Sequence, residues 1–200
     1  MTIRPDFPLM TKSTAAGLSF AELRPLVLQA AMENNLSIAE NTNGRISVVT
    51  RYGVIDFTSG EHGTHIKIKA TKPDWLYTLK VGLVERFTGI FPETTSALRW
   101  SDQTQAEVFP PNFHFTTVRS ITPVGTCFMR VRIKGTDLSS FRDESIHFRV
   151  VLPAEGLQNI EWPTYSENGS TVWPKGDKTL HRPVYTTRWV DHDNNLMDFD

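Results

Sequence analysis

The sequence predicts an α+β N-terminal domain, formed by an antiparallel sheet with two helices, followed by an all-β antiparallel Greek-key barrel. Helical periodicity occurs only in the first half, strand signals occur in both halves, and the polar run S-D-Q-T-Q-A-E-V-F-P-P separates them. A proline pair neither continues a helix nor fits a central strand, so this run marks a boundary. We expect a lead-in over residues 1–17, the α+β domain over 18–101, a linker over 102–111 and the barrel over 112–200.

Composition excludes several classes of function. The chain has 200 residues, 39% of them hydrophobic, which is enough for a packed core in each domain. Its 21 basic and 22 acidic residues give a net charge of −1, which argues against nucleic acid or an anionic membrane as the main partner. The sequence contains neither a signal-peptide core nor eighteen consecutive apolar residues, so we expect a cytoplasmic protein without integral membrane association.

Local signals place the elements of the first domain. Ser19 and Glu22 form a capping box for a helix over residues 20–34, and Pro73 with Asp74 begins a second helix. Asn35 is the predicted stop of the first helix. Between the helices, alternation and turn residues predict an antiparallel meander. Its strands, and one last strand after the second helix, are predicted over residues 36–39, 45–50, 53–58, 65–70 and 97–100.

The second domain shows only strand signals. We expect strands over residues 115–122, 126–134 and 146–152, a spacing typical of a closed antiparallel barrel. Residues 153–181 have almost no periodicity. Because this long loop contains Trp162 and Trp173, we expect it to pack onto the barrel.

The run R-P-V-Y-T-T-R at residues 182–188 is a strand with unusual chemistry. Strand alternation predicts that side chains point to two opposite faces. The first face carries Arg182, Val184, Thr186 and Arg188. The second carries Pro183, Tyr185, Thr187 and Trp189. The guanidinium of Arg182 suits a pyrophosphate, the Tyr185 ring suits an isoalloxazine, and the Thr186 hydroxyl with nearby backbone N–H groups suits the polar edge of a flavin.

These residues resemble the R-x-Y-[ST] fingerprint of the ferredoxin reductase-like flavoproteins. The longer run R-P-V-Y-T-T-R-W-V-D, ending in L-M-D-F-D, resembles the siderophore-interacting proteins, which are FAD-dependent ferric-siderophore reductases. The runs P-P-N-F, R-V-R-I-K-G, H-F-R-V-V-L-P and W-P-K-G occur in the order expected for their FAD-binding barrel. The resemblance implies that Arg182 binds the FAD phosphates, Tyr185 stacks on the isoalloxazine, Thr186 bonds the flavin edge and Val184 gives backbone contacts.

The rest of the chain resembles this family only in part. The first domain is similar in layout to a small domain of unknown function that precedes siderophore-interacting modules. In the family an NAD(P)H-binding α/β domain follows the barrel, whereas this sequence ends at Asp200 and contains no G-x-G-x-x-G. We therefore expect a chain truncated before that domain and inactive alone, with NAD(P)H or ferredoxin as donor only in a full-length form.

Two functions follow from the sequence. The first is the FAD-binding portion of a ferric-siderophore reductase that releases iron by lowering Fe(III) to Fe(II), with a ferric siderophore and an electron donor as partners. The alternative is a non-catalytic binding or accessory module, or an inactive fragment, that retains the flavoprotein barrel.

Other candidate sites have weaker support. His62 and His65 have metal-site spacing, but no cysteine or further histidine completes a tetrahedral set. Residues 191–195, D-H-D-N-N, offer oxygen ligands but read as a hairpin turn. We predict no metal site and assign no catalytic residue.

Overall fold

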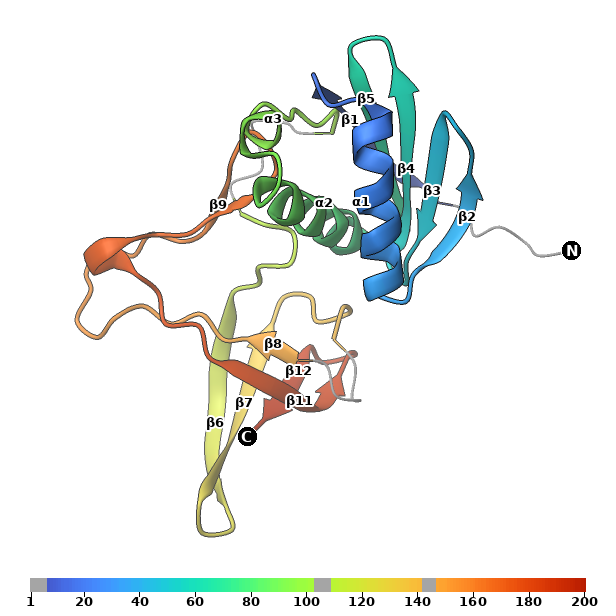
Figure 1. The fold of residues 1–200 in the computed structure, drawn as a ribbon. Helices are drawn as coiled ribbons and strands as arrows, with labels where there is room; N and C mark the ends of the chain where they lie inside the picture. The colour runs from blue at the N-terminus through green and yellow to red at the C-terminus, as the bar shows by residue number, and fades with distance from the viewer. Residues whose placement is uncertain (1–6, 103–108, 142–146) are drawn as a thin grey trace, which may run out of the picture. The chain divides into compact units, whose positions relative to one another are not determined.

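The computed structural model describes residues 7–102, 109–141 and 147–200 and divides the chain into two compact units (Figure 1). Unit 1 contains Met1–Pro111 together with Thr164–Val172, and unit 2 contains Asn112–Pro163 and Trp173–Asp200. The start of the predicted lead-in, most of the predicted linker and Ile146 lie outside the described residues. No helix in the described ranges is both long and apolar enough to cross a bilayer.

Unit 1 is built on a five-stranded antiparallel sheet with the order β1-β5-β4-β3-β2. The helices α1 and α2 lie on one face of this sheet and bury their apolar residues in a single core with it (Figure 1). The elements in chain order are β1 (Leu9–Ala16), α1 (Phe20–Glu33), β2 (Ser37–Asn41), β3 (Arg45–Val49), β4 (Gly53–Gly60), β5 (Gly63–Ala70), α2 (Pro73–Thr88) and α3 (Pro92–Ser96).

Local capping accounts for both long helices. The Ser19 side chain accepts a hydrogen bond from the Glu22 backbone N–H while the Glu22 carboxylate accepts one from the Ser19 N–H, which confirms the predicted capping box. At the other end of α1, Asn35 adopts φ 50°, a left-handed conformation that ends the helix. Pro73 begins α2 as predicted, because proline has no N–H to leave unpaired in the first turn.

Strand β1 corrects the expectation of an unstructured lead-in. Its eight residues pair along their whole length with β5. Thr11, Ser13 and Ala15 alternate toward the buried side, but their small or polar side chains hide this two-residue period from a hydrophobicity pattern. A second correction concerns residues 97–100, which follow α3 without forming a strand although Leu98 and Trp100 are buried.

The hairpin of residues 164–172 belongs to unit 1, which differs from the expectation that the whole loop packs onto the barrel. It contains β9 (Thr164–Tyr165) and β10 (Thr171–Val172). The Nε1 of Trp100 donates to the Asn168 carbonyl at 2.7 Å, and Asn168 Nδ2 donates to the Thr95 carbonyl at 3.2 Å. The rings of Tyr77 and Tyr165 meet edge to face, 5.3 Å apart.

Unit 2 contains a five-stranded antiparallel sheet with the order β6-β7-β12-β11-β8. Its strands are β6 (Thr116–Val124), β7 (Phe128–Gly135), β8 (His147–Arg149), β11 (Val184–Asp191) and β12 (Leu196–Phe199), with a short helix η1 (Gly176–Lys178) before β11. The sheet is open rather than closed into the predicted barrel, because among the described residues β6 pairs only with β7 and β8 pairs only with β11.

Candidate flavin site

Strand β11 places the predicted flavin residues where its pairing changes from one edge to the other (Figure 1). Residues 184–186 pair with residues 147–149 of β8 on one edge. From Thr187 onward, the strand pairs with β12 on the opposite edge. Within the part of the chain that the structure describes, no strand pairs with the second edge of residues 184–186.

The guanidinium of Arg182 is held over an aromatic ring just before β11. Its Cζ lies 4.2 Å from the centroid of the Trp173 ring. Stacking occupies the flat face of a guanidinium and leaves its in-plane N–H donors for oxygen acceptors. The backbone carbonyl of Arg182 accepts a hydrogen bond from Nη1 of Arg149 at 3.0 Å. The site therefore combines two exposed guanidinium groups, as an anionic pyrophosphate requires.

Trp173 and Arg149 were not predicted as site residues. Arg149 lies opposite Val184 in the register of β8 and β11. Because the two residues are far apart in sequence, a local sequence pattern could not predict that they meet. Trp173 stands directly before P-K-G, in the run that precedes β11. This position was the sequence feature that could have indicated an aromatic ring beside Arg182.

Tyr185 lies on the core side of the sheet. Its half-buried ring packs against Phe199 and Phe148, with centroid distances of 4.8 Å and 6.3 Å. Thr186 faces the other way, and its hydroxyl lies 3.0 Å from Nδ1 of His147. Val184 shares the face of Thr186 because strand side chains alternate. A ligand that contacts both Tyr185 and Thr186 must therefore lie at the edge of β11 rather than flat on one face.

A bulge corrects the predicted alternation in the second half of β11. The register with β12 shifts between Thr187 and Trp189, so Arg188 is the extra residue. Thr187 and Val190 are buried, whereas Arg188 and Trp189 are exposed. Trp189 therefore does not share the face of Thr187, as strict alternation would require.

An ion-pair ladder crosses β7, β12 and β11 beside this site. Asp198 is bonded to Nε and Nη2 of Arg132 at 2.7 Å each, and Asp200 is bonded to Nε and Nη2 of Arg130 at 2.8 and 3.1 Å. Asp200 also accepts from Nε of Arg188 at 2.8 Å. The hydrogen bonds from Arg130, followed by those from Arg188, outweigh burial and lower the pKa of Asp200 from 3.8 to about 2.

This lowered pKa predicts acid lability of the edge of the ladder. Because the pKa of Asp200 is lower in the folded state, its contribution to stability is complete above pH 3.8 and is lost as the pH falls from 3.8 toward about 2. The protection factors of the β7 and β12 amides, which correct for the intrinsic pH dependence of exchange, should therefore fall over that interval. In Asp200→Asn the fall should be smaller. Equal pH dependence in the two proteins would contradict the role given to Asp200.

The hairpin turn between β11 and β12 accounts for the acidic run at residues 191–195. The Asp191 side chain accepts hydrogen bonds from the backbone N and the Nδ2 of Asn194, at 3.0 and 2.8 Å, and Asn195 adopts φ 53°. These are the interactions expected of Asp and Asn in a turn. The prediction of a hairpin turn here is confirmed.

Comparison with known proteins is informative for the second half of the chain. Residues 116–200 match the family model described as the siderophore-interacting FAD-binding domain. No curated protein and no solved structure shows a significant match to the chain. The matched range contains the strands of the unit 2 sheet and all of the predicted flavin residues, which supports an FAD-binding module there.

Proposed function

We propose that unit 2 binds FAD at the start of β11, around residues 182–186, as the FAD-binding portion of a cytoplasmic ferric-siderophore reductase. The observation that carries this proposal is the grouping of cationic, aromatic and backbone groups around one end of β11, inside the range that matches an FAD-binding family. The donor set fits the cofactor because FAD combines a doubly charged pyrophosphate with a flat, apolar ring that has one polar edge.

Each residue has a separate role in this proposal. Arg182, oriented by Trp173 and assisted by Arg149, binds the phosphates. The ring of Tyr185 contacts the isoalloxazine, with its position fixed by Phe199. The Thr186 hydroxyl and the backbone of Val184 hydrogen-bond to the polar edge of the flavin.

Bound FAD would supply the electron transfer that lowers Fe(III) to Fe(II) in a ferric siderophore. Ferrous iron is a softer cation, so the hard oxygen ligands of a siderophore hold it less tightly. The reaction requires an electron donor, for which we propose NAD(P)H or ferredoxin. The chain described here would bind and orient the flavin and exclude water from it.

Titration with FAD tests the binding part of the proposal. We expect the 200-residue chain to quench flavin fluorescence on binding, and Arg182→Ala to weaken the affinity by at least about tenfold, or ~1.4 kcal/mol. Trp173→Ala should weaken binding to a smaller extent, because it removes only the group that orients Arg182.

Arg119→Ala provides the matched control. Arg119 is an exposed arginine on β6, so its replacement removes one positive charge from unit 2 without affecting β11. Its FAD affinity should equal that of the wild-type chain. Absence of FAD binding by the folded wild-type chain, or equal loss in Arg119→Ala and Arg182→Ala, would count against the proposed site.

A non-catalytic binding module is the second candidate. It is favoured by the open sheet that the described residues of unit 2 form. The two functions differ in turnover. With photochemically reduced FAD and ferric citrate, a reductase should form ferrous iron faster with the wild-type chain than with Arg182→Ala at equal total flavin, whereas a binding module should give equal rates.

A further inference from the structure

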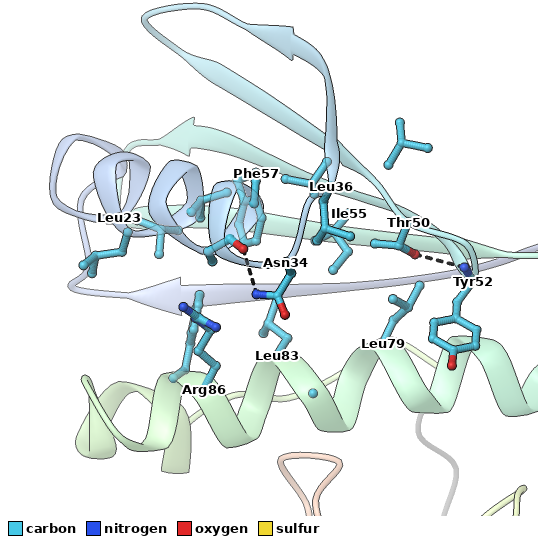
Figure 2. Close-up of a pocket in the computed structure, with 18 of the residues that line it drawn as sticks. Leu23, Asn34, Leu36, Thr50, Tyr52, Ile55, Phe57, Leu79, Leu83 and Arg86 are labelled. Carbon is cyan, nitrogen blue, oxygen red and sulfur yellow. Dashed lines mark hydrogen bonds between the residues drawn. The ribbon is translucent and has the colours of Figure 1, made fainter. Parts of the chain in front are cut away.

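Unit 1 contains a large apolar cavity that the proposed flavin chemistry does not use. It has a volume of about 750 Å³ and lies between α1, α2 and the strands β3 and β4 (Figure 2). Its floor consists of buried aliphatic and aromatic side chains, among them Leu23, Val27, Val48, Phe57 and Leu83. This volume is within the range of sites that enclose small organic ligands.

Small residues on the two helices make the room for this cavity. Ala30 and Ala31 line it from α1, and Gly82 lines it from the middle of α2. A Cβ added at Gly82 would meet no atom within 4 Å. Glycine inside a helix lowers its stability by about 1 kcal/mol relative to alanine, so a residue with no steric reason to be glycine weakens α2. Because residue 82 is glycine, no side chain from this position occupies the cavity.

The charged groups that line the cavity have one sign. They are Arg86 on α2 and Arg51 after β3, and no acidic side chain lines the cavity among the residues that the structure describes. Nη2 of Arg86 lies 2.7 Å from Oε2 of Glu33 at the end of α1, which joins the two helices. Figure 2 shows Arg86 beside Leu83, with Asn34 nearby. A ligand with an apolar body and one anionic end would complement these walls.

We propose that unit 1 binds a fatty carboxylate, with its hydrocarbon chain in the cavity and its carboxylate at Arg86. The hydrocarbon chain covers the half-buried apolar part of the lining, which includes Leu26, Leu36 and Ile55 and which water otherwise contacts at a free-energy cost proportional to area. The carboxylate accepts hydrogen bonds from in-plane N–H groups of the guanidinium, and such charged hydrogen bonds are stronger than those between neutral groups. Asn34 and the Tyr52 ring are uncharged, whereas the Glu33 carboxylate pairs with the same guanidinium and competes with the ligand for it.

Calorimetric titration of the 200-residue chain with decanoate, and with decanol as its neutral analogue, tests this proposal. We expect saturable binding of decanoate, about tenfold tighter than that of decanol. Gly82→Phe, which adds a ring at a position that lines the cavity, should weaken the binding of both ligands by more than about tenfold. Gly82→Ala is the matched control and should change the affinity by less than about threefold.

A second pair of variants separates the charge from the ion pair. Arg86→Gln and Glu33→Gln both break the link between α1 and α2, but only the first removes the guanidinium. We expect Arg86→Gln to weaken decanoate by about tenfold and decanol very little, and Glu33→Gln to bind decanoate at least as tightly as the wild-type chain. Arg182→Ala should leave decanoate binding unchanged, which separates this site from the flavin site.

Three results would overturn the proposal. They are absence of decanoate binding by a chain whose circular dichroism shows it folded, undiminished binding by folded Gly82→Phe, and equal loss of decanoate affinity in Arg86→Gln and Glu33→Gln. The last result would mean that the ion pair shapes the cavity while the guanidinium does not bind the carboxylate.

Discussion

Replacing Trp100 with alanine is expected to destabilise unit 1 by about 3–5 kcal/mol and to release the hairpin of residues 164–172. The Trp100 side chain is 4% exposed and belongs to the unit 1 core. Its Nε1 donates to the Asn168 carbonyl, and a Cβ added at Gly169 would lie 3.0 Å from its ring atoms. The alanine variant therefore loses core packing and the attachment of the hairpin together. Urea unfolding followed by circular dichroism measures the first effect, and limited proteolysis within residues 164–172 measures the second.

The Trp100→Phe variant separates the contribution of core packing from that of the hydrogen bond to the hairpin. It keeps an aromatic ring in the core but leaves the Asn168 carbonyl without its indole donor, at a cost of about 1–3 kcal/mol. Proteolysis of the hairpin should then increase without a full loss of unit 1 stability. If Trp100→Ala unfolds at the same urea concentration as the wild-type chain, Trp100 is not the anchor described here.

Removing Arg132 is expected to lower the urea concentration at which unit 2 unfolds, because it leaves the Asp198 carboxylate buried without its two donors. Asp198 is 5% exposed and lies directly across from Arg132 in the register of β12 and β7. The Arg132 side chain is 42% exposed, so water reaches part of the site and makes the loss smaller than for a fully buried pair. Arg132→Met, which keeps an unbranched side chain, tests this by urea denaturation.

The double variant Arg132→Met with Asp198→Leu is the control. It removes both charges and keeps apolar bulk across the two strands, so most of the stability lost in Arg132→Met should return. Recovery would show that the loss came from an uncompensated carboxylate. If the double variant is less stable than Arg132→Met, packing of the Arg132 stem against Trp189, whose ring lies 5.1 Å from the guanidinium, contributes more than the charge.

Features that depend on residues close together in the sequence could be predicted, whereas features that depend on residues far apart in the sequence could not. Both ends of α1 and the start of α2 were predicted because Ser19, Glu22, Asn35 and Pro73 act within a few residues of themselves. The strand β1 was missed because Thr11 and Ser13 are buried by pairing with β5 rather than by their own hydrophobicity.

The candidate flavin site divides in the same way. Arg182, Val184, Tyr185 and Thr186 could be proposed together because they are adjacent in sequence, and their roles stay a prediction. Trp173 and Arg149 reach Arg182 only through the folded chain. The bulge at Arg188 also depends on pairing with β12, so alternation alone assigned Trp189 to the wrong face.

The composition of unit 1 has a consequence for biosynthesis. Because Thr164–Val172 supplies contacts to Trp100, Thr95 and Tyr77, the N-terminal unit cannot be completed on the ribosome until Val172 has emerged. Domains generally fold in order from the N-terminus as they are made. Here most of unit 2 is synthesised before the hairpin can complete unit 1. The surface of unit 1 that the hairpin covers must therefore stay exposed on the nascent chain until Val172 has been made.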